Sequence, residues 1–151
     1  MKKWLKTIKN EKGLTLIELL AVVVILGIIA AIAVPAISNI IDNTKKDAHV
    51  SNAQLIISAG KLAVASNDPD ILSTKTITLR KLVEKGYLEA VPKDPYSTST
   101  YNDASTVSFT KGTSNIEYFI NLVGADNQAV FKNSPIKEEL LNKDGRTQVN
   151  K

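Results

Sequence analysis

The stretch Lys12-Gly13-Leu14-Thr15-Leu16-Ile17-Glu18 decides the fold of this chain, because it leads directly into a long apolar segment. From Leu14 to Val34 the chain runs for 21 residues with Glu18 as its one charged residue. As an α-helix this segment would be roughly 31 Å long, about the thickness of the hydrocarbon core of a bilayer. We therefore predict a membrane-spanning helix. Glu18 lies near the start of this helix, where a carboxylate is costly and usually serves a function.

The charge is concentrated before this segment. Residues 1–13 hold five lysines and one glutamate, whereas residues 14–151 hold 14 basic and 14 acidic residues and are neutral. A basic flank is typical of the cytoplasmic side of a membrane helix. It predicts a single-pass protein in the cytoplasmic membrane, with its N-terminus inside and the rest outside. We do not expect direct sequence-specific nucleic acid binding, since the exported part has no excess of basic residues.

The helical pattern continues beyond the apolar segment. Residues at spacings of three, four or seven form an apolar stripe: Ile37, Ile41, Thr44, Ala48, Leu55, Ala59 and Leu62. No cluster of turn residues occurs before Asn67-Asp68-Pro69-Asp70. The pattern predicts one helix from about Leu14 to Ser66, near ~80 Å long. Its second half is amphipathic, and we expect the stripe to form one wall of the hydrophobic core.

The rest of the chain predicts a small head with an antiparallel sheet. After a loop, a short helix is expected near Leu79–Lys85 and should end at Gly86. A proline-punctuated loop, Tyr87–Tyr96, follows. Alternating apolar residues then predict three strands, near Thr106–Lys111, Ile116–Leu122 and Ala129–Phe131.

The short links between these strands are rich in turn residues, so they predict a meander. Tyr118, Phe119 and Phe131 are expected in the core of the sheet. After the last strand we expect a short helix, with Ser134 as its cap and Pro135 in its first turn, and a loose polar end over Lys143–Lys151. The fold class is therefore α+β. Because the chain has no cysteine, the head depends on a hydrophobic core, a metal or packing against other subunits.

The stretch Gly13–Leu20 resembles the cleavage and methylation signature of type IV pilins and of the pseudopilins of type II secretion. Pro35 falls where that family commonly has a helix-breaking proline. Two further segments, Gly86-Tyr87-Leu88 and Pro92–Tyr96, resemble the loop after the first helix in pseudopilins. Tyr96-Ser97 replaces the Trp-Gly pair usual there.

The resemblance implies that a membrane-embedded prepilin peptidase cuts after Gly13 and methylates the new amine of Leu14. It implies three parts: a leader, residues 1–13; a transmembrane and assembly helix, residues 14–35; and a pilin-like soluble head, residues 36–151, which includes the amphipathic half of the helix. After cleavage the subunit would polymerise through its N-terminal helix into a cell-surface filament.

The partners implied by the family are the peptidase, identical or related subunits in a helical homopolymer, and an assembly platform with its ATPase. Such filaments serve cell adhesion, twitching motility, DNA uptake or protein secretion. The sequence leaves alternatives open: a pseudopilin of a type II secretion or competence system, or an unprocessed, membrane-anchored binding protein.

Glu18 suggests how cleavage leads to assembly. In a helical stack, Glu18 of one subunit is able to pair with the free amine of Leu14 on its neighbour. Before the cut no such amine exists. The simpler alternative is a tolerated charge near the cytoplasmic face.

An ordinary signal peptide cut after Ala31-Ile32-Ala33 is another alternative. It is disfavoured by Glu18, which would lie inside its apolar region, and by the helical pattern that continues past the site. Gly27 and Pro35 predict a helix kink. The family resemblance implies that the segment between them unwinds in a filament.

The remaining polar residues suggest no chemistry. The pattern predicts that His49 lies on a polar face of the helix, with no cysteine or second histidine beside it. We therefore do not expect it to bind a metal. The side chains Asp94, Asp103, Asp126 and Asn127 are candidate oxygen ligands for Ca²⁺, but their spacing lacks an EF-hand pattern and fits turns. There is no catalytic grouping or phosphate-binding loop in the sequence. We expect a structural protein without cofactors rather than an enzyme.

Overall fold

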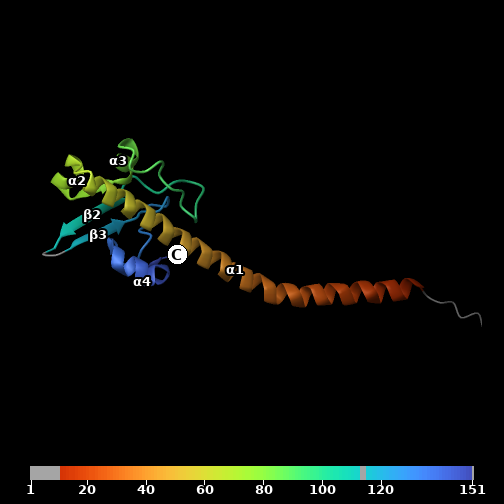
Figure 1. Cartoon of the computed structure of the whole chain (residues 1–151). Helices are drawn as coiled ribbons and strands as arrows, with labels where there is room; N and C mark the ends of the chain where they lie inside the picture. The colour runs from red at the N-terminus through yellow and green to blue at the C-terminus, as the bar shows by residue number, and fades with distance from the viewer. Residues whose placement is uncertain (1–10, 113–114, 151) are drawn as a thin grey trace, which may run out of the picture. The chain divides into compact units, whose positions relative to one another are not determined.

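The structure is a computed structural model that describes residues 11–112 and 115–150 (Figure 1). The chain divides into two compact units, Met1–Ile41 and Asp42–Lys151. Helix α1, Glu11–Ala65, contributes to both. Most of the predicted leader lies outside the described residues.

The first unit contains the N-terminal part of α1. Its apolar side chains are exposed over every face of the helix, with Leu16, Leu19 and Ile32 between 66% and 71% accessible. Within the described residues α1 is the one helix long and apolar enough to cross a membrane. The helix continues through Pro35 without interruption. This confirms the predicted apolar helix.

The head is built on a four-stranded antiparallel sheet of order β1-β2-β3-β4. The strands are β1 (Thr76–Thr78), β2 (Thr106–Lys111), β3 (Ile116–Asn121) and β4 (Ile136–Lys137). One row of paired residues crosses all four strands, and all its members are buried: Ile77, Val107, Ile120 and Ile136. This row is the sheet's side of the core.

The C-terminal part of α1 supplies the other side of the core. Its buried residues recur every three or four positions: His49, Ala53, Ile56, Ile57, Gly60 and Ala63. Gly60 lets the sheet approach closely, because a Cβ there would lie 2.7 Å from Cγ1 of Val107. The sheet therefore packs on a helix face in which the small residues Ala53, Gly60 and Ala63 lie beside the larger Ile56 and Ile57.

Three shorter helices complete the head: α2 (Pro69–Thr74), α3 (Leu79–Glu84) and α4 (Glu138–Gln148). The side chain of Thr78 caps α3 by accepting from the backbone N–H of Lys81. Gly86 follows α3 with a φ of 75°, the left-handed conformation expected of a helix-terminating glycine. The predicted α3 and its ending are thus confirmed.

The structure corrects the predicted orientation of α1. Of the predicted core stripe, only Ala59 is buried in the head, whereas Leu55 and Leu62 are 52% and 53% exposed. Ile37 and Ile41 are also exposed. The head packs instead on the neighbouring stripe around Ala53, Ile56 and Gly60, where the glycine lets Val107 of the sheet approach closely.

Two corrections concern the strands. Helix α2 and strand β1 lie where a loop was predicted. Elements this short contain too few residues to show a periodic pattern of apolar side chains. The predicted strand Ala129–Phe131 makes only isolated bridges, Val123↔Ala129 and Phe131↔Val149. The place beside β3 is taken by β4, which pairs Ile136 with Ile120.

The C-terminus also differs from the prediction. A cis peptide bond joins Ser134 to Pro135, and α4 begins only at Glu138, so Ser134 is not its cap. The hydroxyl of Ser134 instead donates to Asn121 Oδ1 at 2.6 Å. The expected loose end is largely helical, because Leu141 and Val149 are buried in the core.

Candidate assembly segment and polar network

The residues predicted to direct processing lie at the start of α1. The backbone of Gly13 and Leu14 is helical, and Glu18 follows Leu14 by four residues. Residues four apart are neighbours on one helix face. Glu18 is exposed in this single subunit, among exposed apolar neighbours such as Ile17 and Leu19. A surface of this kind requires lipid or other apolar helices around it.

Gly27 and Pro35 both lie within helical backbone. A Cβ at Gly27 would have no neighbouring atom within 4 Å, so packing within this subunit does not explain why this position is glycine. Pro35 has no N–H to donate to the carbonyl of Ala31. The helix is therefore less stable at these two positions than elsewhere in the segment, because Gly27 has no side chain and Pro35 makes no helical hydrogen bond through its nitrogen.

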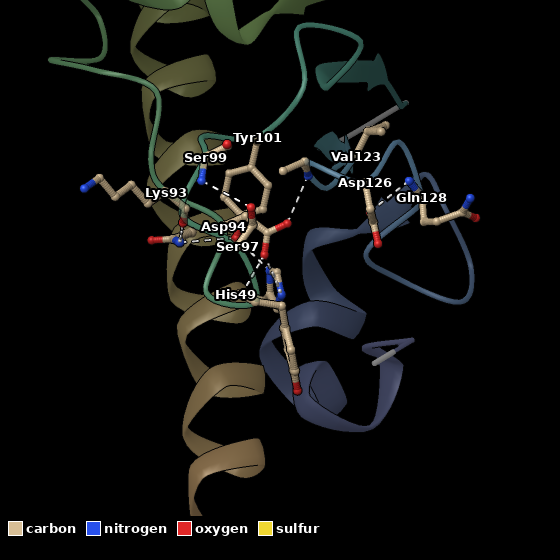
Figure 2. A network of polar contacts seen from close by, with 12 residues as sticks. His49, Lys93, Asp94, Ser97, Ser99, Tyr101, Val123, Asp126 and Gln128 are labelled. Atoms are coloured by element: carbon tan, nitrogen blue, oxygen red, sulfur yellow. Dashed lines mark hydrogen bonds and ion pairs between the residues drawn. The ribbon is translucent and has the colours of Figure 1, made fainter.

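The head contains a buried polar network around His49 (Figure 2). Nδ1 of His49 lies 2.7 Å from the hydroxyl of Tyr101, and its Nε2 lies 3.7 Å from Oδ1 of Asp94. The imidazole also stacks on Tyr96, with ring centroids 5.4 Å apart and planes 14° apart. The prediction that His49 stands on a polar helix face is wrong, because the loop Lys93–Tyr101 covers this side of α1.

Asp94 holds two loops together from within this network (Figure 2). Its side chain is 1% exposed. Oδ1 accepts from the N–H of Tyr96 at 2.8 Å, and Oδ2 accepts from the N–H of Ala125 at 3.0 Å. Two backbone donors thus replace water around the buried carboxylate.

Tyrosines connect the same loop to α1. The hydroxyl of Tyr96 donates to the carboxylate of Asp42. Burial, and secondly this hydrogen bond, raise the pKa of Tyr96 to about 12. Burial also raises the pKa of Tyr101. The phenols are therefore held in their neutral, hydrogen-bonding forms.

Charged side chains strengthen the attachment of α1 to the head. Lys45 Nζ lies 4.9 Å from the ring centroid of Tyr96, and Asp42, which accepts from Tyr96, is paired within α1 with Lys46 at 2.7 Å. On α4, Arg146 donates from two nitrogens to the carboxylate of Asp47. Sequence reasoning missed the contact between Asp47 and Arg146, since nothing local links these two positions.

The four candidate calcium ligands do not converge. Asp103 pairs with Arg80 at 3.1 Å, and Asn127 bonds to Asn102. The carboxylates of Asp94 and Asp126 do come together, since each has an oxygen within 2.9 Å of where a Cβ on Gly124 would be.

In the described part of the chain, no group of three or more His, Cys, Asp or Glu side chains is placed to hold a metal ion. Of the four candidates, only the carboxylates of Asp94 and Asp126 lie together, and each accepts a hydrogen bond from a backbone N–H.

The long apolar helix, the antiparallel head and the Gly13–Glu18 signature define a pilin-like subunit of a filament. The family model described as "Prokaryotic N-terminal methylation motif" matches residues 8–34. The chain is 32% identical over 138 residues to "Type II secretion system core protein G" of Vibrio cholerae serotype O1, covering 82% of this chain and 87% of that protein. No solved structure matches.

The chain therefore belongs to the type IV pilin and type II secretion pseudopilin family. Members of this family are structural subunits, and the apolar helix is that of a membrane-anchored protein.

Proposed function

We propose that this chain is made as a precursor in the cytoplasmic membrane, with its N-terminus inside. A prepilin peptidase cleaves it between Gly13 and Leu14 and methylates the amine of Leu14. The mature subunit then polymerises through the apolar part of α1. The observation that carries this proposal is the exposure of apolar side chains on every face of that part, because only lipid or other helices are able to cover it.

Glu18 would couple cleavage to assembly. An apolar filament interior has a low dielectric, so a carboxylate there is stable only beside a positive charge. The amine of Leu14 supplies this charge, and it exists only after cleavage. A precursor would bring an unpaired carboxylate into the filament, and is therefore excluded.

Gly27 and Pro35 would bound the segment of the helix that unwinds most easily in the filament. Pro35 removes one helical hydrogen bond, and Gly27 lacks a side chain and disfavours helix by about 1 kcal/mol relative to alanine. Unwinding between them would lengthen this segment and allow the filament to stretch, while leaving the head attached.

The filament would serve either a type II secretion system or a surface pilus. Similarity to a core protein of type II secretion favours a secretion pseudopilus as the second candidate, beside a surface pilus for adhesion or motility. Partners would be identical or related subunits, an assembly platform and its ATPase.

Mass spectrometry of membranes and of sheared filaments tests processing. The one tryptophan, Trp4, and the one methionine, Met1, both lie before Gly13. We expect filament subunits to begin at a methylated Leu14 and to contain neither residue. A monomer that keeps Trp4 would indicate an anchored binding protein, and a chain beginning at Val34 would indicate an ordinary signal peptide.

A further inference from the structure

The loop Lys93–Tyr101 contacts α1 along one face of the helix (Figure 2). Its contacts on α1 follow one another at steps of three, four and three: Asp42, Lys45, His49 and Asn52. Such steps keep the side chains on one side of an α-helix, over roughly 15 Å of its length. The loop therefore runs along about three consecutive turns of α1.

Asp42 is the first of these positions, and it is also the first residue of the compact unit that forms the head. The hydroxyl of Tyr96 donates to the carboxylate of Asp42 and lies 3.4 Å from its backbone carbonyl oxygen. The large residues just before it, Ile40 and Ile41, are both more than half exposed. The loop thus begins to hold α1 at the point where the exposed apolar part of the helix ends.

Tyr96 is itself held in place from the other side (Figure 2). Its backbone N–H donates to Oδ1 of Asp94, whose Oδ2 accepts from the N–H of Ala125, four residues after the end of β3. Two backbone hydrogen bonds of 3.0 Å fix the turn of the loop, from Asp94 to the carbonyl of Ser99 and from Ser97 to the carbonyl of Asp94. Hydrogen bonds therefore lead from α1 through the loop to the segment after β3.

Helix α4 holds the same stretch of α1 from a second direction. Arg146 donates from two nitrogens to the carboxylate of Asp47. Gly145 lies so close to Val50 that a Cβ there would be 2.9 Å from both of its methyl carbons. Asp47 and Val50 fall within residues 42–52, the stretch that the loop contacts. This part of α1 is therefore fixed by two separate elements of the head.

The contacts of the loop require residues 42–52 to remain helical. An α-helix rises about 1.5 Å per residue, whereas an extended chain rises about 3.3 Å. Unwinding of a single turn would therefore move Asp42 several ångströms away from Tyr96. The local sequence adds little stability, since Asn43 and Thr44 both have low helix propensity. The loop thus stabilises a part of the helix that its own residues do not favour.

We propose that the loop Lys93–Tyr101 is a clamp that stops the unwinding of α1 at Asp42 when the filament is stretched. The inference rests on the proposed function, in which the segment between Gly27 and Pro35 unwinds. A helix that has begun to unwind melts further from its new end, because each residue at an end is held by fewer hydrogen bonds. Melting stops at the clamp, where the contacts of the loop must also be broken. The head then keeps its structure while the segment before it changes length.

Hydrogen exchange in sheared filaments, measured by mass spectrometry, tests the clamp. Tyr96→Phe removes the hydroxyl that donates to Asp42 but keeps the aromatic ring. We expect the amides of residues 42–46 to exchange at least about tenfold faster in this variant than in the unaltered chain. Tyr87→Phe is the matched control, because its hydroxyl donates to Asp68, beyond the other end of α1, and should leave these amides unchanged. Equal exchange in the two variants would overturn the proposal.

Alanine substitutions separate the clamp from helix propensity. Alanine favours helix over both aspartate and asparagine. Asn43→Ala, at an exposed position, should therefore slow the exchange of residues 42–46. Asp42→Ala gains propensity as well, but it removes the acceptor of Tyr96 and should speed the exchange. Slower exchange in both variants would contradict the clamp.

The unaltered chain separates this inference from the proposed function. In its filaments we expect fast exchange between Gly27 and Pro35 and slow exchange from Asp42 onward. Slow exchange between Gly27 and Pro35 would contradict the unwinding in the proposed function. Fast exchange that begins there and continues past Asp42 as far as Asn52 would agree with unwinding and overturn the clamp.

Discussion

The hydroxyl of Tyr101 and Nδ1 of His49 lie 2.7 Å apart inside the head, and both side chains are almost completely buried. This hydrogen bond joins the end of the loop Lys93–Tyr101 to the middle of the head part of α1. Asn52, one turn further along α1, donates to the same hydroxyl at 3.2 Å. Tyr101 therefore fastens the loop to the helix at two points.

Tyr101→Phe should destabilise the head by about 1–3 kcal/mol, because a buried imidazole nitrogen loses its partner while the packing volume is almost kept. Chemical denaturation of the chain in detergent, followed by tyrosine fluorescence, measures this loss. Tyr118→Phe serves as the control, since Tyr118 is partly exposed and its ring contact with Lys61 survives. Equal stabilities of the two variants would contradict the role given to Tyr101.

Tyr96 should make the head sensitive to alkali. Its pKa is raised to about 12 by burial and by Asp42, compared with about 10 for an unfolded tyrosine. The fold favours the neutral phenol. The resulting stabilisation is fully present below pH ~10 and is lost as the pH rises through about 12.

Tyrosinate absorbance, recorded together with circular dichroism between pH 9 and pH 13, tests this expectation. Tyr96→Phe should remove one late titration step and shift alkaline unfolding. Complete ionisation of every tyrosine near pH 10, with the head still folded, would contradict it.

Gly60→Ala should destabilise the head despite favouring the helix. Alanine improves helix propensity by about 1 kcal/mol, but its Cβ would lie 2.7 Å from Val107 Cγ1, and overpacking costs about 1–3 kcal/mol. We expect the clash to prevail, with a net loss of about 1 kcal/mol.

The double variant Gly60→Ala with Val107→Ala should recover part of this loss. A thermodynamic cycle over the four proteins measures the coupling of the two sites. Ser58→Ala on the exposed face is the control for helix propensity. Additive effects at 60 and 107 would show that the two residues do not meet.

Glu18→Gln should leave cleavage intact and impair assembly. Removing one partner of a buried ion pair costs about 3–5 kcal/mol. A loss of this size lowers the equilibrium constant for incorporation into the filament by more than about a hundredfold. Filament yield by electron microscopy and the mass of the membrane-bound subunit are the two measurements.

Glu84→Gln is a control for loss of a carboxylate elsewhere, since Glu84 is exposed on α3. Normal filaments from Glu18→Gln would show that the amine of Leu14 needs no such partner.

The sequence alone determined the features that depend on neighbouring residues. The apolar run to Val34 and the turn at Asn67 predicted α1, whose bounds are Glu11–Ala65. Alternation predicted β2, in which Val107 and Phe109 form a buried face, and it predicted β3 although only Ile120 is buried in that strand. The signature from Gly13 to Glu18 likewise needs only the order of residues along the chain.

The tertiary structure alone decided which face of α1 meets the head. Two stripes with apolar residues run along this helix, one with Leu55 and Leu62 and the other with Ile56, Ile57 and Gly60. The sheet packs on the second, where Gly60 leaves room for Val107. The positions of His49, β1 and β4 follow from the same long-range packing. Contacts between distant segments stabilise it, and such contacts produce no periodic pattern of apolar residues in the local sequence.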